Sequence, residues 1–337
     1  MIKQFNMLSQ LCLYAVTMAL VGCGPERPTA RLRVALLTPG PISDAGWNAG
    51  AYEGLQLIKD SLDAEISHVE TRTPAEFEEA FRDYARRGFT LVFGHGFEFQ
   101  DAAARVGADY PNTVFITTSG ATVRQNVSPM VFRLEEGTYL AGMLAAGLTR
   151  TGTVGFVGGI RLPPVEGTFL GFEGGARAVR PSATVLSAYI GNFDDVAAAK
   201  ENALAQIGRG ADVLLHNADA ASFGMFQAAR EANVLAIGAN RDQNAVAPDV
   251  IVASATLEVP RALLLVARRV ATGEFRPGVM FFGIRDGVVD LVINPAMAQR
   301  VPAALRERIM AARDSIIAGT LRVPRVEFVP DSVPVAR

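Results

Sequence analysis

The fold class follows from the stretch Arg33-Val34-Ala35-Leu36-Leu37-Thr38, which is followed by Pro39-Gly40-Pro41 and by an amphipathic segment at residues 47–59. A short apolar run bounded by turn residues predicts a buried strand. The Pro-Gly-Pro break ends that strand, and the amphipathic segment predicts a helix. A strand, a short break and a helix together form the repeating unit of an α/β fold with a parallel sheet.

The same unit recurs through the first third of the chain. We predict further strands at residues 66–70, 90–93 and 113–118, and helices at residues 74–87 and 99–109. Thr73 is expected to cap the helix that starts at Pro74, since its hydroxyl can accept a hydrogen bond from a free backbone N–H group. This order predicts a doubly wound sheet with helices on both faces.

A second series of strands and helices follows and predicts a second lobe. Its strands are expected at residues 154–157, 184–190, 212–216 and 234–238, and its helices at 164–179, 196–209 and 223–231. A helix at 137–148 lies near the passage between the lobes. The strand at 250–253 and the helix at 260–271 are expected to return the chain to the first lobe.

The predicted fold is therefore α/β, with two Rossmann-like lobes whose parallel sheets are joined by crossover strands. The chain has no low-complexity linker between the lobes, so the crossovers should form a hinge rather than a flexible joint. We place lobe 1 at residues 31–131 plus about 255–285, and lobe 2 at residues 132–254 plus about 286–337.

The N-terminal residues have the features of a secretory signal. Lys3 precedes an apolar stretch at residues 11–21, which is too short to span a bilayer, and the stretch ends in Leu20-Val21-Gly22-Cys23. This ending resembles a bacterial lipobox. It predicts a signal peptide at residues 1–22, a lipid on Cys23, and a tether at residues 23–30. The alternative is an ordinary signal peptide with a cysteine at its end by chance.

Localisation and cysteine use follow from this interpretation. The protein would be anchored to a cell membrane and face the periplasm or the exterior, with the choice of membrane left open. Cys12 lies in the segment that would be removed, so Cys23 would be the one cysteine of the mature chain. An intramolecular disulfide or a zinc site of cysteines is therefore not expected.

Composition argues against several classes of function. The 337 residues carry a formal net charge of −2 and no basic stripe, so nucleic acid is not an expected partner. The three histidines have no metal-ligand spacing, and the glycine-rich motifs of dinucleotide and P-loop sites are missing from the sequence. Ser119 and His95 have no spacing that favours a catalytic triad. We expect no metal, no cofactor and no catalytic residues.

Ligands of doubly wound sheets bind at the carboxyl ends of the strands. Seven segments in such positions are rich in Gly, Asn, Asp and aromatic residues: 39–48, 94–98, 119–120, 159–164, 191–194, 217–219 and 240–243. This composition suits a neutral polar ligand with a flat ring. The candidate ligand-binding residues from these segments include Gly96, Phe97, Asn217, Asp219 and Asp242.

Motifs spread in order over nearly the whole mature chain resemble the basic membrane protein family, which comprises lipoprotein receptors of ABC importers best known for purine nucleosides. The motifs are residues 44–48 (DAGWN), 52–54 (YEG), 132–142 (FRLEEGTYLAG), 155–159 (GFVGG), 171–176 (GFEGGA), 189–195 (YIGNFDD) and 237–243 (IGANRDQ). The resemblance implies a type I periplasmic-binding-protein fold. It also implies an extracytoplasmic solute-binding lipoprotein that takes up its ligand between two lobes by hinge closure.

In that family, two aromatic rings clamp the base and polar side chains hold the sugar. The resemblance implies that Trp47 and Phe193 supply the rings and that Asn48 stands beside them. Each ring also has an alternative role as a packing residue. Asp44 either binds the ligand or caps the helix that follows it.

The chain departs from the family at three positions that grip the ribose in relatives. Ser119 and Asn240 stand where the family has aspartates, and Leu257 stands where it has a lysine. Ribose hydroxyl groups would then lack partners, which costs about 1–3 kcal/mol for each buried group. A free purine base, or another flat heterocycle, is expected to fit better than a nucleoside.

The resemblance also implies the partners of the protein. We expect a purine-like small molecule, an ABC permease in the inner membrane, and a protein that acts as a monomer. Two alternatives stay open: a sensory lipoprotein that presents its ligand to a signalling partner, and a nucleoside-cleaving enzyme, for which the sequence lacks a carboxylate cluster or metal set.

Overall fold

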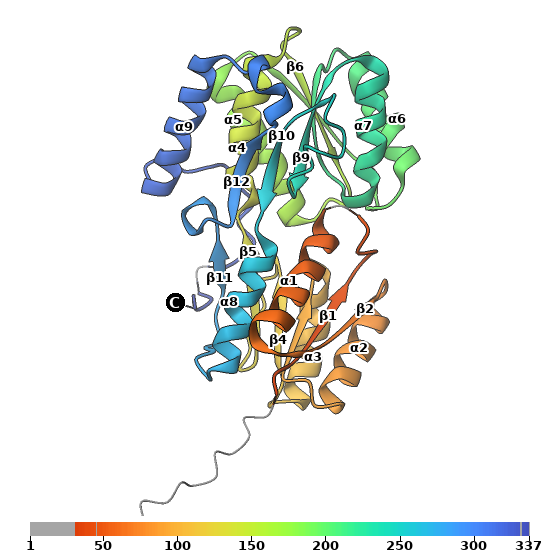
Figure 1. Ribbon diagram of the computed structural model, residues 1–337, viewed down its shortest axis with the longest axis vertical. Coiled ribbons are helices and arrows are strands. Elements are labelled where there is room, and N and C mark those ends of the chain that lie inside the picture. Colours follow the sequence, from red (N-terminus) through yellow and green to blue (C-terminus); the bar gives the residue numbers. More distant parts are fainter. Residues whose placement is uncertain (1–30, 45, 331, 337) are drawn as a thin grey trace, which may run out of the picture. The chain divides into compact units, whose positions relative to one another are not determined.

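The computed structural model describes residues 31–44, 46–330 and 332–336 (Figure 1). The predicted signal peptide, the tether and Cys23 lie outside the described residues. From Leu32 to Arg337 the chain forms one compact unit. None of the helices in the described ranges has both the length and the apolar character needed to cross a bilayer.

The first sheet is fully parallel and has the strand order β11-β5-β4-β3-β1-β2. Its strands are β1 (Arg33–Thr38), β2 (Glu65–Glu70), β3 (Leu91–Gly94), β4 (Val114–Thr118), β5 (Val127–Phe132) and β11 (Met280–Phe282). Successive residues of β1 enter different cores: Val34 and Leu36 pack in one cluster, Ala35 and Leu37 in another. Both faces of the sheet are therefore covered, as in a doubly wound fold.

The second sheet has the order β12-β10-β9-β8-β6-β7, and β12 is antiparallel to β10. Its strands are β6 (Thr153–Gly158), β7 (Thr184–Tyr189), β8 (Val213–Asn217), β9 (Leu235–Asn240), β10 (Ile251–Leu257) and β12 (Val289–Ile293). The α/β architecture with two mostly parallel sheets confirms the predicted fold class.

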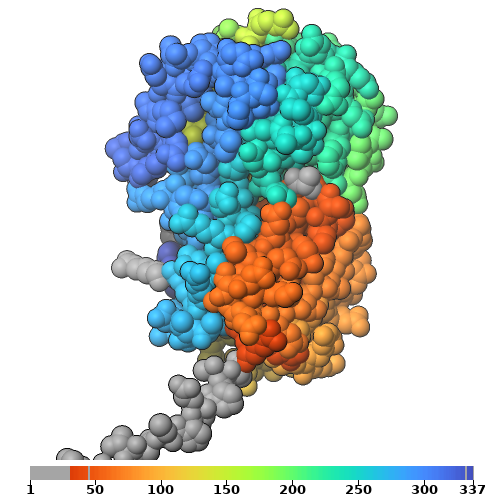
Figure 2. All heavy atoms as spheres, in the orientation of Figure 1, coloured from red at the N-terminus to blue at the C-terminus, as the bar shows by residue number. Residues whose placement is uncertain are grey.

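The helices pack in pairs on the two sheets. In the lobe of the first sheet, helix α1 lies beside α8 (Figures 1 and 2). In the same lobe α2 lies beside α3, and in the other lobe α4 packs on α5 and α6 on α7 (Figure 1). The α-helices are α1 (Trp47–Leu62), α2 (Pro74–Arg86), α3 (Gln100–Asp109), α4 (Leu134–Leu148), α5 (Pro163–Val179), α6 (Val196–Gly208), α7 (Ser222–Ala232), α8 (Val259–Ala271) and α9 (Ala303–Ala318). Short 3-10 helices are η1 (Phe97–Phe99), η2 (Asp219–Ala221), η3 (Ile284–Asp286) and η4 (Pro295–Arg300).

One predicted assignment was wrong. The strand expected to return to the first lobe is part of β10, which pairs with β9 and β12 in the second sheet. It stays there because it directly extends the parallel order of that sheet, and the chain crosses over only afterwards, when α8 packs against α1. Strands β5, β11 and β12 and helix α9 were not predicted.

The predicted cap of α2 is present. The Thr73 hydroxyl accepts a hydrogen bond from the backbone N–H of Glu76, and the Glu76 carboxylate accepts from the backbone N–H of Thr73. Pro74 occupies the first turn. This reciprocal arrangement satisfies two backbone donors that the helix itself cannot.

Three segments between the sheets are hydrogen-bonded to one another: the links from β5 to α4, from β10 to α8, and from β11 to β12. The backbone N–H of Arg133 donates to Phe282 O at 2.8 Å, and that of Glu258 donates to Val288 O at 2.7 Å. The Glu136 carboxylate accepts from the N–H of Ile284 at 2.8 Å. We call these links the crossover segments. Their mutual hydrogen bonds hold them together between the two sheets, at the position where a hinge is expected.

The C-terminal residues run back to the edge of the first sheet. Val335 forms a parallel bridge with Val279, whose N–H donates to Pro334 O at 2.8 Å. Upstream, the Phe328 ring meets the Phe97 ring edge-on, with centroids 5.8 Å apart. The tail therefore contacts both the edge strand and the residues near η1.

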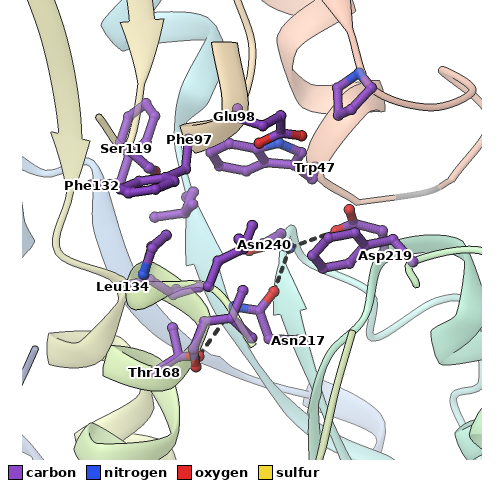
Figure 3. Close-up of a pocket in the computed structure, with 17 residues that line it drawn as sticks. Trp47, Phe97, Glu98, Ser119, Phe132, Leu134, Thr168, Asn217, Asp219 and Asn240 are labelled. Carbon is purple, nitrogen blue, oxygen red and sulfur yellow. Dashed lines mark hydrogen bonds between the residues drawn. The ribbon is translucent and has the colours of Figure 1, made fainter. Parts of the chain in front are cut away.

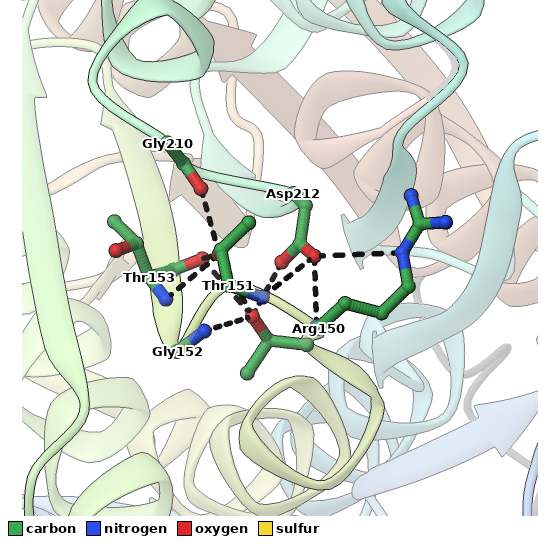
Figure 4. Close-up of polar contacts among 7 residues, drawn as sticks. Arg150, Thr151, Gly152, Thr153, Gly210 and Asp212 are labelled. Atoms are coloured by element: carbon green, nitrogen blue, oxygen red, sulfur yellow. Dashed lines mark hydrogen bonds and ion pairs between the residues drawn. The ribbon is translucent and has the colours of Figure 1, made fainter.

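Asp212 fixes the turn from α4 into β6 (Figure 4). Its carboxylate accepts from the Thr149 hydroxyl and from the backbone N–H groups of Arg150 and Thr151, the last two at 2.8 and 3.3 Å. Asp212 stands just before β8, so one buried side chain ties the end of α4 to the start of a central strand.

Helices α4 and α5 approach so closely that glycine is required where they cross. A Cβ atom on Gly175 would overlap the carbonyl oxygen of Tyr139, and one on Gly142 would overlap that of Phe172. Gly208 differs, because nothing lies within 4 Å of the corresponding position.

We predict that Gly175→Ala lowers the free energy of unfolding by about 3 kcal/mol, because backbone must move to admit the methyl group. The control Gly208→Ala should be neutral or stabilise the protein by about 0.5 kcal/mol, since alanine favours helix. Urea unfolding measures both. Equal stability of the two variants would contradict the backbone-to-backbone packing of α4 on α5.

Candidate functional site

A cavity lies where the carboxyl ends of strands from both sheets meet (Figure 3). It holds about 590 Å³ of empty space, part of which is open to solvent. The lining residues are Pro39, Trp47, Gly96, Phe97, Glu98, Ser119 and Phe132 from the first lobe, and Leu134, Leu162, Pro164, Val165, Thr168, Phe193, Asn217, Asp219, Asn240 and Leu257 from the second. A cavity with largely apolar walls and a few polar groups is typical of small-molecule sites.

Trp47 forms part of the wall and is held from behind by His95. The two rings are stacked at 3.9 Å between centroids and 22° between planes. The Trp47 indole N–H donates to His95 O at 3.3 Å, and Phe132 meets the indole edge-on at 5.9 Å. Trp47 is thus both a packing residue and a lining residue.

His95 is fully buried and neutral. Its Nε2–H donates to Trp47 O at 3.0 Å, so its Nδ1 is the acceptor for the Thr118 hydroxyl at 3.3 Å. Burial lowers the pKa of His95 to about 3. An uncharged ring in this tautomer fixes the position of the indole.

Phe193 enters the wall from the turn before α6. Its ring lies against Gly159, where any side chain would overlap it. The carbonyl of Phe193 accepts from the N–H of Ala221 at 3.0 Å, which ties this turn to η2. Glycine at position 159 is therefore the condition for the ring to lie where it does.

The polar groups of the second lobe form a connected network. The Asn240 amide donates to Asp219 Oδ1 at 3.2 Å and to Asn217 Oδ1 at 3.4 Å. The Asn217 amide donates to Thr168 Oγ1 at 3.1 Å, and the Thr168 hydroxyl donates to Val165 O at 2.6 Å. Figure 3 shows these side chains opposite Trp47 and Glu98.

Three lining residues have left-handed backbone conformations. The φ angles are 65° for Ser119, 43° for Asp219 and 68° for Asn240. Residues other than glycine pay a conformational cost there of about 1 kcal/mol or more, and such residues often cluster at functional sites. The three lie in or just after β4, β8 and β9, so the strain is concentrated at the rim of the cavity.

The cavity contains two carboxyl groups with perturbed acidity. Burial raises the pKa of Asp219 well above its ordinary value, and the nearby Asp44 and Glu98 carboxylates raise it further. Burial also raises the pKa of Glu98, against a hydrogen bond from its own backbone N–H. Among the described residues that line the cavity, none is a lysine or arginine.

The structure brings together eight of the eleven predicted ligand-binding residues. Those that line the cavity are Trp47, Gly96, Phe97, Ser119, Phe193, Asn217, Asp219 and Asn240. Leu257 lines it as well. Ser119, Asn240 and Leu257, the three positions at which we expect the chain to depart from the family it resembles, therefore face the same space.

The other three predicted residues do not line the cavity. The Asp44 carboxylate accepts from the backbone N–H groups of Gly46, Asn48 and Ala49 at 2.7 to 3.0 Å, which is the capping alternative. Asn48 is buried beside Gly40, and within the described ranges its Oδ1 has no hydrogen-bond partner. Asp242 Oδ1 accepts from the N–H of Asn244 at 3.0 Å.

Several lining residues were not among the predicted site residues. Glu98 could have been predicted as a site residue, because it lies in the segment 94–98, one of the segments that follow a predicted strand. Phe132 and Leu134 flank the end of β5, which was not predicted. Thr168 lies within α5, one turn beyond its start, and no sequence pattern marks it.

Two ion pairs join the lobes beside the cavity. Arg72 contacts Asp194 at 3.2 Å, and Arg241 contacts Glu53 at 2.8 Å. Arg72 also contacts Glu70 at 2.6 Å. The side chains are partly exposed, so each pair contributes little free energy, typically about 0–1 kcal/mol. The two ion pairs show that the lobes are in contact in this conformation.

Comparison with known proteins identifies one family. Residues 31–325 match the model of the Bmp family, described as ABC transporter substrate-binding protein PnrA-like. Basic membrane protein A2 of Borrelia garinii subsp. bavariensis is 30% identical over 302 residues, which cover 87% of this chain and 88% of the relative.

A second relative and a solved structure agree with that match. The ABC transporter nucleoside-binding protein BmpA of Lactococcus lactis subsp. cremoris is 26% identical over 87% of this chain and 89% of its own length. An ABC transporter solute-binding protein from Aeropyrum pernix K1 has the same fold, with a TM-score of 0.80 at 22% identity, over 86% of this chain and 92% of that one.

We predict that His95 stabilises the fold only while it is uncharged. Its folded pKa of about 3 lies below the ordinary value of 6.5, so protons bind the unfolded state preferentially as the pH falls from 6.5 towards 3. The stability of the wild type relative to His95→Gln should therefore shrink by about 1.4 kcal/mol per pH unit in this window.

Urea unfolding of both proteins at several pH values measures the difference. Glutamine does not titrate, and all other groups are shared, so their contributions cancel. A difference that stays constant between pH 7 and pH 5 would contradict the neutral, buried state of His95.

Proposed function

We propose that this chain, which belongs to the Bmp family of PnrA-like ABC transporter substrate-binding proteins, captures a free purine base or a similar flat heterocycle between its lobes. Substrate-binding proteins of this family act outside the cytoplasm and deliver a small molecule to an ABC permease. The observation that carries the proposal is the aromatic wall formed by Trp47 with its supporting residue His95.

A flat ligand is supported by the number and placement of the rings. Trp47, Phe97, Phe132 and Phe193 all line the cavity and come from both lobes. Stacking of a base on one such ring is worth about 1–3 kcal/mol in nucleic-acid-binding proteins. Since His95 already covers one face of Trp47, the ligand would use the face turned to the cavity.

A free base is preferred to a nucleoside because the groups that hold ribose in relatives are replaced. Ser119, Asn240 and Leu257 line the cavity, at positions where the motifs of the family lead us to expect two aspartates and a lysine. Leu257 adds an apolar surface that offers no hydrogen bond to a hydroxyl group. A buried sugar would leave polar groups unpaired there.

Hinge closure on the ligand is supported by the crossover segments and the interlobe contacts. The crossover segments are short and hydrogen-bonded to one another, so they can turn as a unit. The ion pairs of Arg72 with Asp194 and of Arg241 with Glu53 are weak enough to break on opening. We infer that the closed form is the one that the permease recognises and that the protein acts as a monomer.

The proposal is tested by calorimetric titration with adenine, guanine, adenosine and guanosine. At least one base should bind, and it should bind more tightly than its own nucleoside, because the sugar gains few partners. Tighter binding of the nucleosides would overturn the preference for a base. Absence of binding by all four compounds would overturn the purine assignment itself.

We also propose that Cys23 carries the lipid that holds the protein at the membrane, although this residue lies outside the described part of the chain. The expected outcome for Cys23→Ala is loss of incorporated radiolabelled palmitate and release of the protein from the membrane fraction. A control at the other cysteine, Cys12→Ala, should leave both unchanged. Labelling that persists in Cys23→Ala would refute the anchor.

A further inference from the structure

The polar lining of the cavity is rich in hydrogen-bond acceptors and poor in donors. Both bonds that the Asn240 amide donates end on protein atoms, Asp219 Oδ1 and Asn217 Oδ1. The Thr168 hydroxyl donates to Val165 O. The donors of the network are thus largely used within the protein, while its acceptors are not.

Several acceptor atoms have no partner among the residues that the structure describes. These are the second oxygen of Asp219 and the amide oxygen of Asn240, for which no hydrogen bond is found, and the Glu98 side chain, which is bonded only by its own backbone N–H. The side-chain donors left over are one N–H of Asn217 and the Ser119 hydroxyl. A complementary ligand must therefore supply donors.

The two carboxyl groups come from opposite lobes. Glu98 belongs to η1 after β3, where its carboxylate folds back over Gly96, and Asp219 begins η2 after β8. Figure 3 shows both at the cavity, with Glu98 beside Trp47 and Asp219 beside Asn240. Neither forms an ion pair with a described residue, and no described lysine or arginine lines the cavity.

We propose that the cavity selects a flat heterocycle whose edge carries adjacent N–H donors, as in a cyclic guanidine or amidine, and that Glu98 and Asp219 accept hydrogen bonds from this ligand. This inference rests on the proposed function, since it names the chemistry of the base. The guanine edge, with its ring N1–H and 2-amino group, has the required form. A ligand phosphate is not expected to bind, because it would face two acidic side chains and no lysine or arginine among the described lining residues.

The raised pKa values of Glu98 and Asp219 mean that burial favours their protonated forms in the empty cavity, and a ligand that donates hydrogen bonds to them would favour the ionised forms and lower both pKa values. Burial makes their ionised forms costly in the empty cavity. The N–H groups of the ligand would replace the hydrogen bonds to water that Glu98 and Asp219 lose on burial. Hydrogen bonds to a carboxylate are stronger than those between neutral groups. A ligand with acceptors in the same place would oppose the oxygens instead.

The test compares guanine with hypoxanthine, which differ only in the 2-amino group, by calorimetric titration of the wild-type protein. Guanine is expected to bind roughly 10-fold to 100-fold more tightly, because hypoxanthine leaves a buried acceptor unpaired. Guanosine monophosphate is expected not to bind. Equal affinity for guanine and hypoxanthine, or binding of the monophosphate, would overturn this inference while leaving capture of a base intact.

Two variants locate the effect. Asp219→Asn and Glu98→Gln keep the shape of each side chain but replace an acceptor by a donor, so the preference for guanine should fall towards equality in both. The control Asp249→Asn, on the surface of the same lobe as Asp219 and paired with Arg230, should keep the wild-type ratio.

Thermal unfolding shows whether each variant is folded. If Asp219→Asn does not fold, the affinity ratio of Glu98→Gln alone decides the test. An unchanged ratio in a folded variant would remove the role of that carboxyl group. If no purine binds the wild type at all, the proposed function fails, and this inference fails with it.

Discussion

The hydrogen bonds among the crossover segments are the constraint on which the site depends. They hold the carboxyl ends of two separate sheets towards one cavity, with Arg133 bonded to Phe282 and Glu258 to Val288. Ligands of parallel sheets collect at such ends, but a single sheet would offer them an open crevice. Two sheets joined in this way enclose the cavity from both sides. The residues that line the cavity therefore need not be close in sequence. The crossover segments determine which strand ends, and so which side chains, lie at the cavity.

Trp47 belongs both to the packing of the first lobe and to the wall of the cavity. His95 stacks on one face of the indole and binds the backbone of the same residue, so the ring is part of the core of the first lobe. Its position is then fixed before any ligand arrives, which lowers the entropy that binding would otherwise cost. Because a charged His95 could not be buried there, the stability of the lobe and the geometry of the wall share a requirement for a neutral ring.

The fold class could be predicted from the sequence because the pattern of buried strands and amphipathic helices is strong in both lobes. The prediction of individual strands failed where the local sequence pattern conflicts with the tertiary structure. β5 contains Pro129, which argues against a strand, yet it pairs with β4 in the first sheet. β11 has only three residues and is defined by its partner β5 rather than by its own composition.

For the site, the strand-end rule placed eight of the eleven candidates at the cavity but could not separate binding from capping. Asp44 and Asp219 both follow strands and both precede helical turns. Both carboxylate oxygens of Asp44 accept hydrogen bonds from backbone N–H groups at the start of α1. Asp219 lines the cavity instead, and one of its oxygens has no hydrogen-bond partner among the described residues. The difference lies in the direction of each side chain, which depends on backbone angles that the sequence does not encode locally. Thr168 could not be found for the same reason.

The arrangement of donors and acceptors follows from that difference. A buried amide must place its N–H groups on acceptors, and Asn240 finds them in Asp219 and Asn217 rather than in a ligand. An aspartate at position 240 would bring a further carboxylate against Asp219 without an intervening donor. The Asn240 amide avoids that repulsion, because it donates to the Asp219 carboxylate instead of opposing it. The two N–H groups of Asn240 are therefore bound within the protein, and its amide oxygen is left as an acceptor at the cavity.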